Sequence, residues 1–198
     1  MTTSTRLQAA VEQGRALRGS VPRRSHADWP ASERRSDPVD TLQREFRTLD
    51  PSLVKLRLAR MATSPFSCLR GSVSVMADDA STLPATGISV RTCGDSHIAN
   101  FGVFATSERA LAFDMNDFDE TTLGPWEWDL KRFATSLVLS GRQAGRPVER
   151  SNDTVKRAVH SYIAETHRLS RLSVHFTTTE TIPIPMVGAA NTVRRGAW

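Results

Sequence analysis

Cysteine is scarce in this chain of 198 residues, which has only Cys68 and Cys93. Two cysteines cannot form a disulfide framework, and so few thiols are typical of a reducing compartment, so we expect a cytoplasmic protein. The sequence also lacks any run of 18 apolar residues and any apolar segment near its N-terminus. We therefore expect neither a transmembrane helix nor a secretory signal, and no membrane partner.

Lysine is scarce as well, with three residues among the 26 cations. The formal net charge is +5, yet residues 114–129 hold six carboxylates and no cation. A face that binds duplex nucleic acid would not normally contain this concentration of negative charge, so nucleic acid is not the partner we expect. A divalent cation suits the segment better, because such ions prefer oxygen ligands.

Three regions differ in character along the chain. Residues 1–36 predict an arm that is helical at 4–18 and then extended through a segment rich in proline, serine and arginine. The whole chain has 39% hydrophobic and 24% charged residues, which is typical of a globular protein, and we expect its folded part at residues 37–172. Residues 173–198 have no sustained period, and we expect an irregular tail that is truncated or altered by a frameshift.

Helix start signals open the folded part. Asp37-Pro38 and Asp50-Pro51 each combine an N-cap aspartate with a proline at the first helical position, which predicts two helices. Residues 66–80 predict a further helix. Alternating apolar residues then predict a strand at 88–93 and a hairpin with strands at 101–105 and 110–114.

Two amphipathic helices are predicted after the acidic segment. The first has apolar residues at helical spacing, which predict a buried stripe formed by Trp126, Leu130, Phe133, Ala134, Leu137, Val138 and Gly141. The second begins near Ser151 and would bury Val155, Ala158, Val159, Tyr162, Ile163 and Leu169. The sequence therefore predicts an α+β fold in which short strands and a hairpin lie between helices.

The predicted hairpin brings polar residues from its two ends together. The two ends of an antiparallel hairpin lie side by side, so Asn100 before the hairpin is expected near Asp117 after it. Asp95 precedes Asn100 by five residues and reaches the same point, with Asp114 and Asp119 at the rim. Such hard oxygen atoms suit Mg²⁺ or Mn²⁺. A solvated acidic turn is the alternative interpretation.

Several motifs resemble known families. The segment Gly94–Asn100, GDSHIAN, is similar to the catalytic loop of aminoglycoside and choline kinase-like phosphotransferases, and Asp117-Phe118-Asp119 stands where those enzymes have a metal-binding aspartate. More closely, the segments SPFSCLRGSVSVMADD, CGDSHIANFG, FDMNDFDET and GPWEWDLKR resemble a bacterial family of uncharacterised proteins, domain of unknown function 2252. That resemblance covers roughly residues 20–145, with four motifs in order.

The resemblance implies a role for each matching residue. It implies a kinase-like catalytic-lobe fragment in which Asp95 is the general base and Asn100 and Asp117 are metal ligands. Gly94 and His97 would support the loop, and Asp129 would be a structural acid that holds it. The implied function is metal-dependent phosphoryl transfer to an unknown small molecule.

Two departures from the kinase pattern affect this interpretation. Cys93 stands where kinases usually have histidine, and the chain has no G-x-G-x-x-G segment to cradle nucleotide phosphates. ATP is therefore expected as a cofactor only if a cradle is supplied elsewhere. The alternative function is a non-catalytic remnant or metal-binding module that lacks the nucleotide lobe.

Three further interpretations stay open on sequence grounds. Arg70, followed by Gly71, is a candidate contact for a phosphate, although a surface or ion-paired arginine is the commoner case. Asp95 and His97 also match the start of a dinuclear metallophosphoesterase site, which would need further histidines. Trp126 and Trp128 flank the acidic segment and could stack on a base or sugar, or anchor the core.

Overall fold

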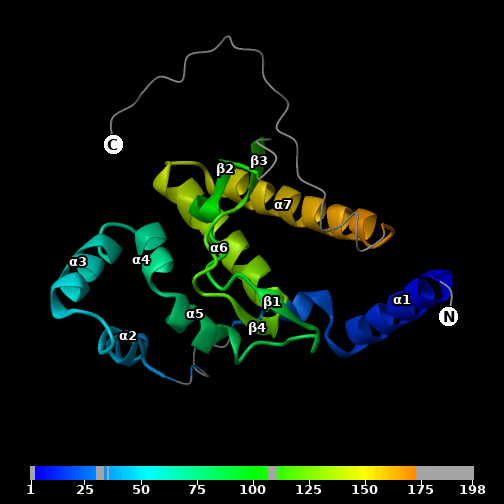
Figure 1. Cartoon of the computed structure of the whole chain (residues 1–198), viewed down its shortest axis with the longest axis horizontal. Helices are drawn as coiled ribbons and strands as arrows, with labels where there is room; N and C mark the ends of the chain where they lie inside the picture. The colour runs from blue at the N-terminus through cyan, green and yellow to red at the C-terminus, as the bar shows by residue number, and fades with distance from the viewer. Residues whose placement is uncertain (1–2, 30–33, 35, 107–110, 173–198) are drawn as a thin grey trace, which may run out of the picture.

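The computed structural model describes residues 3–29, 34, 36–106 and 111–172 (Figure 1). In this part the chain forms an α+β fold, the class that the sequence predicts, and it has seven α-helices and two small antiparallel sheets. The predicted tail at 173–198 and residues 107–110, between the predicted hairpin strands and at the start of the second, lie outside the described residues. No helix of the described ranges has both the length and the apolar character needed to cross a membrane.

The N-terminal half is helical, and its start signals act as expected. The Asp37 side chain accepts a hydrogen bond from the Val39 N–H at 2.7 Å, and the Asp50 side chain accepts one from the Ser52 N–H at 2.8 Å. Figure 1 shows the first helix extending away from the rest of the molecule. The elements are α1 (Thr3–Ser20), the 3-10 helix η1 (Arg23–Ala27), α2 (Pro38–Phe46) and α3 (Pro51–Met61).

The single helix predicted at 66–80 is two helices, α4 (Pro65–Gly71) and α5 (Val73–Ala80). Ser72 breaks the helix with φ −125° and ψ 49°, and its hydroxyl donates to the Cys68 carbonyl at 2.7 Å. Gly71 allows a close approach at this point, since a Cβ there would collide with the Met61 side chain of α3. The break thus lets α4 pack on α3 while α5 packs on α2.

The strands form two separate pairs. Strand β1 (Ser89–Thr92) pairs with β4 (Thr122–Pro125), and the predicted hairpin is β2 (Phe101–Ala105) with β3 (Leu111–Met115). Strand β4 was not predicted, because its four residues include a glycine and a proline and resemble a loop. A short 3-10 helix, η3 (Ile98–Asn100), leads into the hairpin.

The last two helices, α6 (Glu127–Gln143) and α7 (Val148–Leu169), pack against each other (Figure 1). Gly145, with φ +67°, follows the end of α6, and α7 begins three residues before the predicted Ser151. The helices approach closely, since a Cβ added at Gly141 would lie 2.5 Å from the Ser151 hydroxyl.

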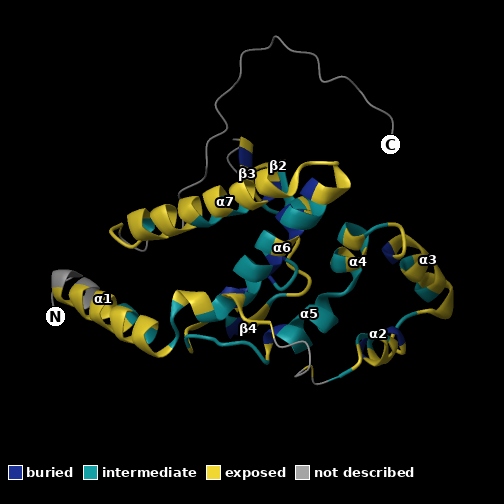
Figure 2. Cartoon of the chain, turned by 180° about the vertical axis from the view of Figure 1, so that it is seen from behind, coloured by how far each residue is buried: buried dark blue, intermediate teal, exposed yellow. Residues whose placement is uncertain are grey.

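The buried face of α6 differs from the predicted apolar stripe. Of that stripe only Leu137 and Gly141 are buried, whereas the polar Glu127, Arg132 and Ser136 are at most 3% exposed. Tyr162 and Ile163 of α7 were predicted to be buried but are exposed. The prediction was wrong because loops pack on the polar side of α6 and supply partners for its polar groups. Figure 2 shows buried residues along α6 and exposure over most of α7.

Candidate active site

The site begins at a loop, residues 93–100, that the first turn of α6 holds at two backbone positions. The Asp129 carboxylate accepts hydrogen bonds from the Cys93 N–H at 2.7 Å and from the Gly94 N–H at 3.1 Å. A carboxylate that accepts backbone N–H groups makes charge-assisted bonds, which are stronger than neutral ones. Asp129 therefore fixes the point where β1 ends and the loop begins.

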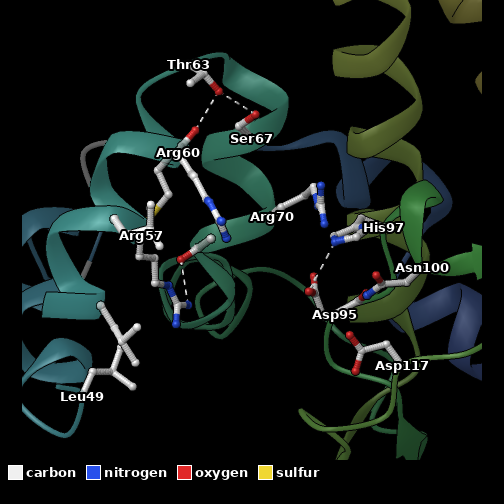
Figure 3. Close-up of a pocket in the computed structure, with 14 residues that line it drawn as sticks. Leu49, Arg57, Arg60, Thr63, Ser67, Arg70, Asp95, His97, Asn100 and Asp117 are labelled. Carbon is white, nitrogen blue, oxygen red and sulfur yellow. Dashed lines mark hydrogen bonds and ion pairs between the residues drawn. The ribbon is translucent and has the colours of Figure 1, made fainter. Parts of the chain in front are cut away.

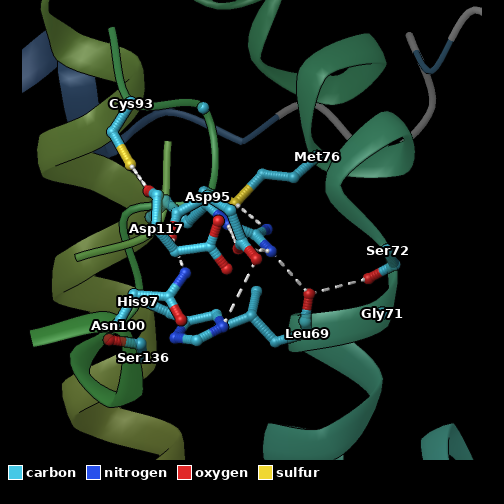
Figure 4. A network of polar contacts seen from close by, with 12 residues as sticks. Leu69, Gly71, Ser72, Met76, Cys93, Asp95, His97, Asn100, Asp117 and Ser136 are labelled. Atoms are coloured by element: carbon cyan, nitrogen blue, oxygen red, sulfur yellow. Dashed lines mark hydrogen bonds and ion pairs between the residues drawn. The ribbon is translucent and has the colours of Figure 1, made fainter. Parts of the chain in front are cut away.

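Arg132 holds the same loop one turn further along α6. Its guanidinium donates through both Nε, at 2.7 Å, and Nη2 to the Oδ1 atom of Asp95. The other oxygen of Asp95 faces His97 (Figure 4). The Nη2 atom also donates to the Leu69 carbonyl of α4 at 2.8 Å, and Nη1 lies 3.5 Å from the Met76 sulfur of α5. With 2% of its side chain exposed, Arg132 joins three helices to the loop.

Ser136 completes this side of α6. Its hydroxyl is fully buried, accepts a hydrogen bond from the Ile98 N–H at 3.0 Å and donates to the Phe133 carbonyl at 2.7 Å. Asp129, Arg132 and Ser136 are spaced three and four residues apart, so they share one face of the helix. We name these three side chains the loop clamp, because they bind the loop at Cys93 and Gly94, at Asp95 and at Ile98.

The loop also makes hydrogen bonds within itself. The Asp95 carbonyl accepts from the His97 N–H and from the Asn100 side-chain Nδ2, each at 2.8 Å. The Asn100 N–H donates to the His97 carbonyl at 2.9 Å. These bonds explain the spacing of five residues between Asp95 and Asn100, because the asparagine closes the turn that the aspartate opens.

Two residues at the start of the loop bring it against the acidic segment. Gly94 has φ +85°, and a Cβ there would collide with the Glu120 carbonyl, so both conformation and space favour glycine. The neighbouring Cys93 thiol donates to the Asp117 carbonyl at 3.1 Å. Burial raises the pKa of this thiol to about 11, so it stays protonated at neutral pH. A nucleophilic role for Cys93 therefore has no support in this geometry.

The hairpin delivers Asp117 in the way that its topology predicts. Phe101 pairs with Met115, and the Asn116 N–H donates to the Asn100 carbonyl at 3.0 Å just beyond the paired strands. Asp117 then follows directly. The two ends of the hairpin thus place the acidic segment beside the Asp95–Asn100 turn.

A pocket of about 710 Å³ opens in front of this turn (Figure 3). Asp95, His97, Asn100 and Asp117 line one wall, with the Asp95 and Asp117 carboxyl groups directed toward the same space. Helices α3 and α4 form the opposite wall and contribute Arg70, the phosphate-contact candidate. Asp114 and Asp119 are exposed and outside the lining, and Asp129 lies behind the loop that it holds.

The charge state of Asp95 follows from its surroundings. Burial by itself raises the pKa of the carboxyl, but the facing His97 ring and the charge of Arg132 lower it more, so the pKa lies below its usual value. The His97 Nε2 atom is 3.4 Å from the Asp95 Oδ2 atom, and its Nδ1 atom is buried with no hydrogen-bond partner in the described part of the chain. Asp95 is therefore ionised at neutral pH, with Oδ1 taken by Arg132.

Two oxygen donors of this wall fit a divalent cation. Because the Asn100 Nδ2 atom is bonded to the Asp95 carbonyl, its Oδ1 atom is left as an acceptor. Among the described residues, the exposed Asp117 carboxylate accepts one long bond, from the Asp119 N–H at 3.4 Å. Magnesium is commonly held by one or two protein oxygens together with water and phosphate. Over the described ranges, however, no three His, Cys, Asp or Glu side chains gather as a metal site. A dinuclear site of the metallophosphoesterase kind therefore gains no support.

Arg132 and Ser136 were missed as site residues. The apolar residues of α6 predicted that the other face of the helix is the buried one. The available signal was the spacing of Asp129, Arg132 and Ser136, which puts three polar side chains on one helix face. Of the two tryptophans that flank the acidic segment, Trp126 is partly buried, donates from Nε1 to the Thr86 hydroxyl at 2.9 Å and stacks on Tyr162.

Comparison with known proteins places the chain among bacterial proteins without an assigned activity. The model of the family described as an uncharacterized protein conserved in bacteria, domain of unknown function 2252, matches residues 47–194, which is 148 of the 198 residues. The chain belongs to that family. The match begins and ends later than the range 20–145 that the motifs indicated, and it takes in residues 173–194 of the predicted tail.

The other comparisons give no relative of known activity. No curated protein matches the chain, and no solved structure does. The likeness of the Gly94–Asn100 loop to kinase-like phosphotransferases has no counterpart in these comparisons, so it remains an interpretation of the residues themselves.

Proposed function

We propose that this pocket transfers a phosphoryl group to a hydroxyl of a small molecule with the help of a divalent metal ion. One observation carries the proposal. An ionised carboxylate from Asp95, a free amide oxygen from Asn100 and an exposed carboxylate from Asp117 line one wall of the same pocket. Phosphoryl transfer uses these groups, namely a carboxylate that accepts the proton of the nucleophile and oxygen ligands that hold metal beside the phosphates.

Each residue then has a distinct task. Asp95 accepts the proton of the substrate hydroxyl while the hydroxyl oxygen bonds to phosphorus and the bond to the leaving group breaks. Arg132 positions Asp95 by occupying its Oδ1 atom, so the substrate proton would go to Oδ2, which faces the His97 Nε2 atom at 3.4 Å. Asn100 and Asp117 would hold Mg²⁺ or Mn²⁺, which neutralises phosphate charge when bound. The clamp keeps these groups in place, and fixed geometry supplies much of the rate in such reactions.

The phosphoryl donor is the part of the proposal that the chain supports least. The sequence has no G-x-G-x-x-G segment, and no lysine is among the described residues that line the pocket. The residues present therefore do not form the usual site for ATP phosphates, and we assign no step to ATP. This observation favours a second candidate function, a metal-binding module that lacks catalysis.

Titration with Mn²⁺ tests the metal half of the proposal. We expect calorimetry to show binding to the full chain that Asp117→Asn weakens at least tenfold, because the substitution removes the charged ligand. Asp153→Asn is the matched control, since Asp153 is an exposed carboxylate on α7, outside the pocket lining, that pairs with Lys156 at 3.9 Å. Equal binding by the wild type and both variants would overturn the metal assignment.

A second assay separates the enzyme from the binding module. Release of labelled phosphate from ATP or pyrophosphate, with Mg²⁺ present, should be faster with the wild type than with Asp95→Asn. A thermal melt of the variant checks that it is folded, because Asn keeps one oxygen for Arg132. Intact metal binding with equal release rates in both proteins would favour the module.

A further inference from the structure

The wall of the pocket opposite Asp95 carries two arginines whose guanidinium groups have no partner among the described residues. Arg60 is in the last turn of α3 and Arg70 in the last turn of α4, and both side chains are exposed. Both line the pocket, and Figure 3 shows Arg70 extending toward His97 while Arg60 extends into the pocket from the α3 side. Within the described part of the chain, neither guanidinium makes an ion pair or a hydrogen bond.

A third arginine on this wall shows how a structural guanidinium differs. The Arg57 Nη2 atom lies 2.6 Å from Glu45 and donates to the Gly71 carbonyl at 3.1 Å, and its guanidinium lies over the Phe46 ring. Arg57 therefore has its charge compensated by α2 and positions the end of α4. Arg60 and Arg70 have neither kind of contact.

The charges of the residues that line the pocket indicate the charge of the ligand that it would bind. On the site wall, Arg132 compensates Asp95, so Asp117 is the one lining carboxylate of the described residues without an arginine or lysine partner. A metal ion bound there would make that wall positive as well. Two uncompensated guanidinium groups that share a pocket repel each other, and an anion between them removes the repulsion.

We propose that Arg60 and Arg70 form an anion subsite that binds a phosphoryl group of the ligand. The identification of the anion as a phosphoryl group rests on the proposed function. The positive charge of the wall is independent of that proposal. Guanidinium groups bind phosphate oxygens through paired N–H donors, and two of them can hold one tetrahedral group from two sides. The hydroxyls of Thr63 and Ser67 line the same wall, where Thr63 donates to the Arg60 carbonyl at 2.7 Å and to the Ser67 hydroxyl at 3.0 Å.

The rest of this wall fits an organic ligand body. Leu49, Leu53 and Leu56 line the pocket beside the arginines, and about 710 Å³ is a usual volume for a small-molecule site. The phosphoryl group has two chemical sources, a polyphosphate donor or a phosphate already present on the acceptor. Both would place an anion on Arg60 and Arg70 and a second group near Asp117.

Binding measurements in EDTA test the subsite apart from the metal. The full chain is titrated by calorimetry with pyrophosphate and with glycerol 3-phosphate, and the same is done with Arg60→Gln, Arg70→Gln and the control Arg142→Gln. Arg142 is an exposed arginine in the last turn of α6 and does not line the pocket. We expect each pocket variant to weaken binding about fivefold to tenfold, as loss of one charge-assisted contact does, and the control to bind like the wild type.

The outcomes separate the two sources and the two proposals. Tighter binding of pyrophosphate indicates a polyphosphate donor, and tighter binding of glycerol 3-phosphate indicates a phosphorylated acceptor. No binding by the wild type, or equal binding by all variants, overturns the subsite. Because Mn²⁺ binding is measured separately through Asp117→Asn, failure of the subsite leaves the metal assignment standing, and failure of the metal assignment leaves the subsite standing.

Discussion

Two walls of one pocket use arginine in opposite ways. One wall is formed by the 93–100 loop and Asp117, and we name it the α6 wall because α6 holds the loop from behind. Arg132 of α6 lies behind this wall with 2% of its side chain exposed, and it donates to Asp95 and the Leu69 carbonyl and lies beside the Met76 sulfur. Arg60 and Arg70 on the α3–α4 wall are exposed and have no ion pair within the described ranges. The buried arginine fixes the reacting groups, whereas the exposed pair is left for a ligand.

The difference follows from burial. A charge removed from water is tolerated only when its hydrogen-bonding groups find partners, so the α6 wall becomes a connected network that cannot easily rearrange. An exposed guanidinium keeps its water and can exchange it for an anion at small cost. We therefore expect substitutions on the α6 wall to change stability and those on the α3–α4 wall to change binding.

The largest expected effect is that of Arg132→Met. Methionine keeps much of the length of the side chain but leaves Asp95 without its counter-ion, and breaking a buried ion pair of this kind costs about 3 kcal/mol or more. Urea unfolding followed by circular dichroism measures the loss. Arg70→Met is the matched control from the opposite wall, and its free energy of unfolding should change by no more than about 0.5 kcal/mol. Similar values for the two variants would remove the contrast between the walls.

Asp129→Ala should cost somewhat less, about 2 kcal/mol, because it leaves the Cys93 and Gly94 N–H groups without an acceptor. Asp153→Ala, which removes an exposed carboxylate from α7, serves as the control in the same unfolding measurement. Hydrogen exchange adds a local readout, since the Cys93 and Gly94 amides should exchange faster in the Asp129 variant. Unchanged exchange at these amides would mean that Asp129 does not hold the loop.

The smallest effect is a dependence on pH. The pKa of Asp95 is lower in the folded protein than the value of about 3.9 of an unfolded aspartate, so its ionised form adds stability above about pH 4. This contribution disappears as the pH falls through the folded pKa. The difference in unfolding free energy between the wild type and Asp95→Asn should therefore become smaller as the pH falls from about 5 to about 2. The exposed Asp50 and Glu165, whose pKa values are also lowered, titrate in both proteins and cancel. A constant difference would show that Asp95 is not held in its charged form.

Local signals in the sequence predicted most of the elements. The aspartate caps before Pro38 and Pro51 fix the starts of α2 and α3 because each acts within two residues of the chain. The hairpin argument placed Asn100 beside the acidic segment because strand pairing needs only the order of the strands. The break at Ser72 and strand β4 were not predicted, since each depends on contacts between elements. The break depends on the close approach of Gly71 to Met61 of α3, and β4 depends on its pairing with β1.

By itself the sequence determined the starts of α2 and α3, the β2–β3 hairpin and three of the polar residues that share the pocket wall, Asp95, Asn100 and Asp117. These follow from capping, alternation and hairpin closure, which act over short stretches of chain. Only the tertiary structure decided which face of α6 is buried, that Arg132 compensates Asp95, and that Arg60 and Arg70 face the same pocket. The reason is physical: the burial of a polar side chain depends on partners brought from elsewhere in the fold, and the spacing of residues along one helix does not identify those partners.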